Sequence, residues 1–284
     1  MSTPEAATSG PIGSFFGRIG RSFLSFRAPI VGLLRHVSGV WHLFLLTTYY
    51  SFIGPFVGRS KLRRQLFPML SNVGARSFPI VFMINFLIGA ILVIQMGPVM
   101  KDFGQTGLIP SVVALAVCRE FGPVMTAIIM TARVGASYTA VLASMKINDE
   151  VLALETMAIH PVGYLVAPRF LAMVIMMPCL VVLSYIVGMI GGGLVAYAIF
   201  DIGAESYIQR TTDGIGMIDV IAGLVKSVAF AVIIALICCY YGLITEGGPM
   251  GLGRNTMVAV VSSLVVVIIA DLIMGAFFIQ YVFA

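Results

Sequence analysis

Five apolar segments, each long enough to cross a bilayer as a helix, constrain this chain more than any other feature. They lie at about 78–99, 111–140, 168–200, 219–243 and 257–282. A span needs about 20 consecutive apolar residues, because a helix rises about 1.5 Å per residue. Of the 284 residues, 60% are hydrophobic and only 10% are charged, against about 25% in soluble domains. The sequence therefore predicts an all-α integral membrane protein, and it excludes disorder, collagen and coiled coil.

Basic residues concentrate before the first span. Nine of the 17 Lys and Arg residues lie before residue 78, where Glu5 is the single acid. Such a basic end favours the cytoplasmic side of a membrane and its anionic lipids. We therefore expect a multi-pass protein with a cytoplasmic N-terminus, a cytoplasmic tail at 1–28 and a single membrane domain at 29–284. Because no basic patch stands on a soluble domain, we expect no nucleic-acid partner.

The segment at about 30–57 could span by length, but basic residues flank it on both sides. Crossing would place one basic flank outside, against the positive-inside rule. An amphipathic helix lying in the inner leaflet keeps both flanks inside. We predict such an interfacial helix, with aromatic and histidine side chains at the interface: Trp41, His42, Tyr49 and Tyr50.

Five spans from a cytoplasmic N-terminus put the loops 100–110 and 201–218 outside, and the loops 141–167 and 244–256 inside. The inner loop 141–167 mixes charged and apolar residues at helical spacing. This pattern predicts a short amphipathic helix on the cytoplasmic surface, between the second and third spans, which Pro161 would end.

Four charged residues lie deep inside predicted spans: Arg119, Glu120, Lys226 and Asp271. A charge near the bilayer centre costs about 2.5–3.5 kcal/mol on insertion scales, so these groups should face protein or water. Their depths are similar and their formal charges sum to zero, which predicts one paired layer inside the bundle. Such a layer either forms the polar floor or gate of a central cavity, or merely locks the helices together.

Other residues within the spans predict local features of the bundle. Gly122 and Pro123 should bend or loosen the second span directly after Glu120, since proline cannot donate a helical hydrogen bond. Arg133, nearer the cytoplasmic end, should reach a phosphate or meet the inner loop. Glycines in the third span favour close helix packing.

We expect neither a cofactor nor a metal site, because three scattered histidines and four cysteines in apolar runs form no ligand set. The cysteines are predicted to be small core residues. The sequence also lacks a nucleotide-binding loop and any recognisable pairing of nucleophile and base. We therefore expect no catalytic residue and no ATP hydrolysis by the chain itself.

A block of motifs in one order resembles the MlaE (YrbE) family of ABC transporter permeases. The block runs through Arg119-Glu120-Phe121-Gly122-Pro123, Ala132-Arg133-Val134-Gly135-Ala136, Met145-Lys146, Ala153-Leu154, Pro168-Arg169 and Lys226-Ser227 to Asp271. The resemblance covers about residue 35 to the end of the chain.

The resemblance implies a homodimeric permease in a bacterial inner membrane. Its partners would be a cytoplasmic ABC ATPase subunit and a periplasmic MCE-domain protein. Its cargo would be phospholipid or a related lipid, moved between the membrane and the MCE tunnel to maintain lipid asymmetry of the outer envelope. A small regulatory subunit bound to the ATPase is left open.

The resemblance also assigns roles to particular residues. The positions of Glu120, Lys226 and Asp271 match polar residues of the family's central lipid cavity. We expect Arg119 to share this polar layer, and Gln95 on the first span to contact lipid. The coupling helix that docks into the ATPase would match about 148–159, with contacts from Asp149, Glu150, Leu154, Glu155 and Met157. The chain departs from the family pattern at Val141, Leu152, Glu155 and His160, which implies an ATPase partner matched to this loop.

Two alternatives belong to other functional classes. A proton-coupled secondary transporter would use Glu120 and Asp271 as proton carriers and would need no ATPase. A membrane scaffold would only anchor an MCE ring, and its charged layer would be structural.

Overall fold

The computed structural model describes residues 36–51 and 61–281. The chain divides into two units, residues 1–44 and 45–284. A helix begins in the first unit and runs from residue 36 to residue 51. In this helix the ring centroids of Trp41 and Phe44 lie 5.6 Å apart. The predicted tail at 1–28 lies outside the described residues, and so do both ends of the predicted interfacial segment. The position of this helix at a membrane interface stays a prediction.

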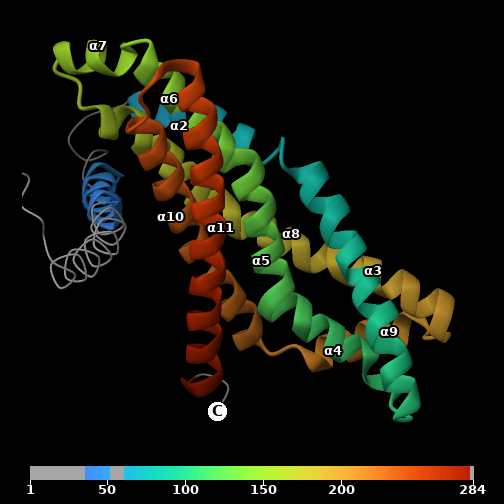
Figure 1. The fold of residues 1–284 in the computed structure, drawn as a ribbon. Coiled ribbons are helices and arrows are strands. Elements are labelled where there is room, and N and C mark those ends of the chain that lie inside the picture. Colours follow the sequence, from blue (N-terminus) through green and yellow to red (C-terminus); the bar gives the residue numbers. More distant parts are fainter. Residues whose placement is uncertain (1–35, 52–60, 282–284) are drawn as a thin grey trace, which may run out of the picture. The chain divides into compact units, whose positions relative to one another are not determined.

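All regular structure in the described residues is helical, and five stretches are long and apolar enough to cross a membrane (Figure 1). They run over Gln65–Asp102, Thr106–Ile147, Val162–Phe200, Met217–Leu243 and Gly248–Tyr281. The predicted all-α membrane fold with five spans is thereby confirmed. The first stretch contains the end of helix α2 (Lys61–Val73) and helix α3 (Phe78–Asp102).

The second stretch is one long helical run with two π-helical turns. Its parts are α4 (Ile109–Ala116), a π turn at Val117–Phe121, α5 (Gly122–Met130), a π turn at Thr131–Gly135 and α6 (Ala136–Ile147). Such turns add one residue to a helical turn and are frequent at functional sites.

A short helix, α7 (Glu150–Thr156), lies between the second and third stretches. The left-handed backbone of Asp149, with φ of 57°, separates it from α6. Ala158 also has φ of 57°, and it ends the segment before Pro161. Positive φ is rare for residues with a side chain, so this connection is built from two sharp corners.

Four further α-helices follow α7 in the described residues. They are α8 (Ala167–Phe200), α9 (Ala204–Gly214), α10 (Met217–Leu243) and α11 (Gly248–Tyr281). Helix α10 packs against α5, α6, α8 and α11, and α10 and α11 run side by side in Figure 1. Side chains on α10 are therefore the most enclosed in the bundle.

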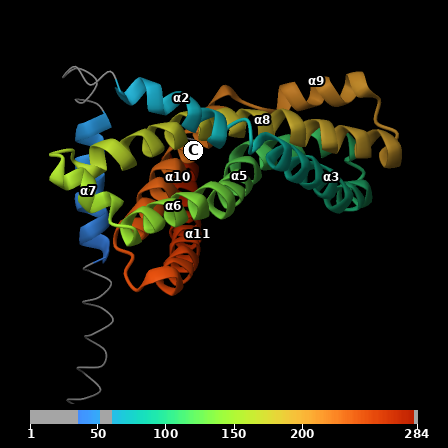
Figure 2. The same ribbon diagram turned by 90° about the horizontal axis from the view of Figure 1, so that it is seen from above.

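Helix α3 packs along α8 at a contact that only glycine allows. A Cβ atom added to Gly89 would lie 1.9 Å from the carbonyl oxygen of Gly188, and one added to Gly191 would lie 2.1 Å from that of Phe86. Figure 2 shows α2 and α9 lying along the same helix, α8. The glycines of the third span therefore serve helix packing.

The structure corrects three expectations. Helix α11 begins at Gly248 rather than near 257, because Gly247 and Gly248 make the turn with positive φ and Pro249 suits a first helical turn. The loop 201–218 contains helix α9, held by the buried side chains of Tyr207 and Thr211. Cys179 is exposed on α8, whereas the other three cysteines are buried.

Candidate functional site

The π turn at Val117–Phe121 positions the first two charged residues, Arg119 and Glu120. Pro123 stands at the start of α5 and has no backbone N–H to donate to the carbonyl of Arg119, four residues earlier. The ammonium of Lys226 on α10 lies 3.2 Å from that carbonyl oxygen and donates to it. The π turn that contains Glu120 thus provides a main-chain acceptor for a buried cation.

Lys226 is the centre of a three-residue ion cluster. Its Nζ donates to Oε2 of Glu120 at 2.7 Å and to Oδ1 of Asp271 at 2.9 Å. The Lys226 side chain is 2% exposed, against 47% for Glu120 and 22% for Asp271. The cluster therefore joins the second, fourth and fifth spans through one buried ammonium, while its carboxylates reach an accessible surface.

Gly275, one turn after Asp271 on α11, lies beside the cluster. A Cβ atom added there would be 3.6 Å from Oε1 of Glu120 and 3.7 Å from Nζ of Lys226. These are ordinary van der Waals distances, and they show that the backbone of α11 lies close to the charges. One ammonium faces two carboxylates, so the cluster carries a formal charge of −1 when all three groups are ionised.

Arg119 does not complete the predicted neutral layer, because its Nε donates to Oδ1 of Asp219 at 2.6 Å. Asp219 is 7% exposed, and its other oxygen accepts a hydrogen bond from the backbone N–H of Gly216 at 2.8 Å. The predicted single group of four is therefore two neighbouring groups, and one residue of the second group is new.

Sequence reasoning missed Asp219 because it stands at the predicted end of a span, where an acid is unremarkable. One signal could have found it. Asp219 and Lys226 are seven residues apart, which places them on the same face of α10 after two turns.

Tyr185 of α8 packs against glycines of the second and fourth spans, near the charged residues. A Cβ atom added to Gly122 would lie 2.6 Å from Cε1 of its ring, and one added to Gly223 would lie 2.1 Å from its hydroxyl oxygen. Two glycines thus let the second and fourth spans close around a tyrosine that is 5% exposed. The sequence assigned Gly122 to a helix break and did not identify this packing role.

Gln95, the remaining residue proposed for the lipid cavity, is exposed on α3. No hydrogen bond or ion pair joins it to the Lys226 cluster within the described residues. The assignment of Gln95 to the lipid cavity therefore stays a prediction.

Helix α7 presents a surface of mixed polarity. Val151 is buried, whereas the apolar side chains of Leu152 and Met157 are 54% and 68% exposed. Asp149, Glu150 and Glu155 are exposed, and Leu154 is half-buried. The outward face of this corner therefore combines carboxylates with uncovered apolar groups, as a docking surface for a protein partner does.

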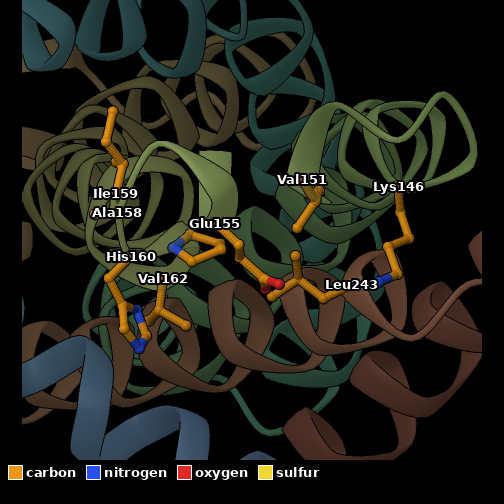
Figure 3. Close-up of a pocket in the computed structure, with 9 residues that line it drawn as sticks. Lys146, Val151, Glu155, Ala158, Ile159, His160, Val162 and Leu243 are labelled. Atoms are coloured by element: carbon orange, nitrogen blue, oxygen red, sulfur yellow. The ribbon is translucent and has the colours of Figure 1, made fainter. Parts of the chain in front are cut away.

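A pocket of about 500 Å³ lies beneath α7 (Figure 3). Its wall includes Lys146 at the end of α6, Glu155 on α7 and Leu243 at the end of α10. His160 also lines it, and the ring of this histidine lies 5.0 Å from that of Tyr50. The pocket therefore lies between α7 and the ends of α6 and α10.

Among the described residues no group of three or more His, Cys, Asp and Glu side chains could hold a metal ion. The arrangement can hold charges within an apolar bundle and can offer two carboxylates to a polar group. An exposed helix, α7, lies at one end of the same bundle.

Comparison with known proteins gives matches over most of the chain. The family model described as Permease MlaE matches residues 66–277. A probable ABC transporter permease protein of Rickettsia typhi is 38% identical over 233 residues, which cover 82% of this chain and 88% of that protein. A second, from Synechocystis, is 33% identical and covers 84% of this chain and 91% of its own length. The chloroplastic protein Trigalactosyldiacylglycerol 1 of Arabidopsis thaliana is 31% identical over 76% of this chain and 62% of its own.

Proposed function

The chain belongs to the MlaE family of ABC transporter permeases, and from this premise we propose that its cargo is a phospholipid or a related lipid. As an ABC transporter permease it is a multi-pass membrane protein that works with an ATPase partner. The lipid, the remaining partners and the orientation are parts of the proposal.

The observation that carries the proposal is the Lys226 cluster. Lys226 stands nine residues into α10, about 14 Å from its start, and Glu120 beside it is 47% exposed. A carboxylate facing lipid tails at such a depth is costly, so protein or a polar cavity should cover it. A cavity with apolar walls and a polar layer suits a molecule with acyl chains and a charged headgroup.

A second copy of this chain would supply the missing wall. Only 17% of the most apolar 18-residue stretch of α11 is buried within the chain, and α11 is the helix that carries Asp271. Two copies meeting near α5 and α11 would enclose both sets of carboxylates between them. We therefore propose a homodimer whose central cavity contains Glu120, Lys226 and Asp271, with Arg119 beside them and Gln95 at the lipid-contacting wall.

Helix α7 is the proposed coupling helix. It is exposed, it lies between the second and third spans, and its acidic and apolar side chains fit a groove in a soluble partner. Movement of the ATPase would reach the bundle through α6 and the start of α8. This assignment places α7, and with it the basic N-terminal end, in the cytoplasm of a bacterial cell.

A periplasmic MCE-domain protein is the proposed acceptor or donor at the opposite end of the bundle. The lipid in the name of the Arabidopsis relative supports lipid as cargo. Exchange with an MCE tunnel would serve lipid asymmetry of the outer envelope.

The first experiment is purification of the tagged chain from its native membrane in mild detergent, with mass spectrometry of the proteins and lipids that accompany it. We expect an ATPase, an MCE-domain protein and phospholipid. A chain that emerges alone and free of lipid, under conditions that preserve a known ABC assembly, would contradict the proposal.

A second experiment separates the proposal from the two alternatives. Liposomes containing the purified assembly and a fluorescent phospholipid should transfer lipid when ATP is added. Transfer by the chain alone under a pH gradient would indicate proton coupling. Loss of assembly in a Lys226→Met chain, without any selective loss of lipid transfer, would favour a scaffold.

A further inference from the structure

A second pocket, lined by three arginines, lies apart from the Lys226 cluster. Its volume is about 370 Å³. Arg133, in its wall, follows Glu120 by 13 residues in the same helical run, about 20 Å along the axis. The pocket therefore belongs to a different level of the bundle from the proposed cargo cavity.

The three arginines come from three separate elements. Arg76 lies in the turn between α2 and α3, Arg133 in the π turn before α6, and Arg169 in the first turn of α8. Their exposure to solvent differs: Arg76 is exposed, Arg133 is half-buried and Arg169 is only 7% exposed. Elements far apart in the sequence thus converge on one small volume with a charge of +3.

Within the described residues, no acid is placed against this charge. The lining contains neither Asp nor Glu, and among the residues that the structure describes no carboxylate forms an ion pair with any of the three arginines. Arg169 donates from Nη1 to the carbonyl oxygen of Leu165 at 2.5 Å, which fixes its guanidinium without neutralising it. A buried cation that lacks a counter-charge is costly, so an anion bound in this pocket would be strongly stabilised.

The rest of the wall indicates which anion. Asn72 and Ser137 add polar groups, whereas Met69, Val73, Val134 and Val141 add apolar surface. Guanidinium groups match phosphate oxygens through paired hydrogen bonds. Apolar side chains next to them suit the glycerol and first acyl carbons of a lipid, which a free phosphate ion lacks.

We propose that this pocket binds the phosphate of an anionic phospholipid as a resident lipid, distinct from the transported cargo. Basic pockets between membrane helices on the cytoplasmic side hold anionic headgroups in this way. Anion binding follows from the pocket itself, whereas its placement in the cytoplasmic leaflet rests on the proposed orientation. The bound lipid would tie α2 to α6 and α8.

The test uses the full-length chain, delipidated in detergent and titrated with three probes by native mass spectrometry. The probes are phosphatidylglycerol, diacylglycerol with the same acyl chains, and inorganic phosphate. We expect phosphatidylglycerol to bind, diacylglycerol not to compete with it, and inorganic phosphate to compete only weakly. Inorganic phosphate that binds as tightly as phosphatidylglycerol would overturn the assignment to a lipid.

Arg133→Gln should weaken phosphatidylglycerol binding about tenfold, the effect of removing one charged hydrogen-bonding group. Arg76→Gln, at an exposed position that tolerates substitution, should weaken it in the same direction if Arg133→Gln does not fold. The matched control is Arg254→Gln, which removes an equal charge from an exposed site on α11. All these chains keep the Lys226 cluster, so the difference among them reports this pocket and not the cargo cavity.

Equal binding by the Arg76, Arg133 and Arg254 variants would overturn the proposal. Failure of lipid transport in the assembled transporter would leave this binding difference intact. The two proposals therefore fail in distinguishable ways.

Discussion

The ammonium of Lys226 lies 3.2 Å from the main-chain carbonyl oxygen of Arg119 and donates to it. Pro123 cannot supply the usual helical donor to this oxygen, so a proline on the second span and a lysine on the fourth are parts of one arrangement. The same ammonium binds Glu120 and Asp271. Helix irregularity and charge pairing therefore have a common structural origin at this site.

Lys226→Met should abolish lipid transfer by the reconstituted transporter, with a fall of at least about tenfold, because two carboxylates would lose their shared cation. Assembly with the ATPase should persist. Lys226→Arg should retain part of the activity, since it keeps the charge. Lys101→Met, at an exposed position near the end of α3, is the control and should transfer lipid normally.

Asp219→Asn should lower the free energy of unfolding by about 1–3 kcal/mol, because the buried partner of Arg119 would lose its charge. Thermal unfolding of the purified chain measures the effect. Asp213→Asn, on the exposed face of α9, should change it by less than about 0.5 kcal/mol. A double-mutant cycle with Arg119→Met should show coupling, and strict additivity would refute the pair.

Gly89→Ala should reduce the yield of folded protein sharply, since its Cβ would meet the carbonyl oxygen of Gly188 at 1.9 Å and the backbones would have to separate. Gly253→Ala is the matched control on α11, where nothing lies within 4 Å of an added Cβ. There alanine should stabilise the helix by about 0.5–1 kcal/mol. Size-exclusion chromatography and thermal unfolding compare the two, and equal behaviour would argue against the close contact.

Glu150→Lys combined with Glu155→Lys should uncouple ATP hydrolysis from lipid transfer without unfolding the chain, because both side chains are exposed on the surface of α7. The measurement is lipid transfer per ATP hydrolysed by the assembled transporter. Glu205→Lys combined with Asp213→Lys, both exposed on α9, is the charge-matched control. Normal transfer by the double variant would remove α7 from the docking surface.

Local chemistry made several features predictable. The five spans follow from uninterrupted apolar length, and Pro123 lies where the π turn at Val117–Phe121 gives way to α5. The exposed helix after α6 follows from charged and apolar residues mixed at helical spacing. Its two sharp corners, at Asp149 and Ala158, carry no clear sequence signal.

Pairing was harder to predict, because it depends on how helices rotate about their axes. Depth along a span placed Arg119, Glu120, Lys226 and Asp271 at one level, and three of them do meet. Arg119 lies next to Glu120 in sequence, yet its side chain turns toward Asp219. Neighbouring residues in a helix point about 100° apart, so equal depth does not imply a common partner.

The sequence by itself determined that this is an integral membrane protein and how many spans it has, since both depend on hydrophobicity summed over contiguous residues. It also determined that charges inside those spans had to be covered. Only the tertiary structure decided that Lys226 serves two carboxylates, that Asp219 pairs with Arg119, and that Arg76, Arg133 and Arg169 share one pocket. Those relationships join residues on different helices, and they arise from how the helices pack, which no local stretch of sequence contains.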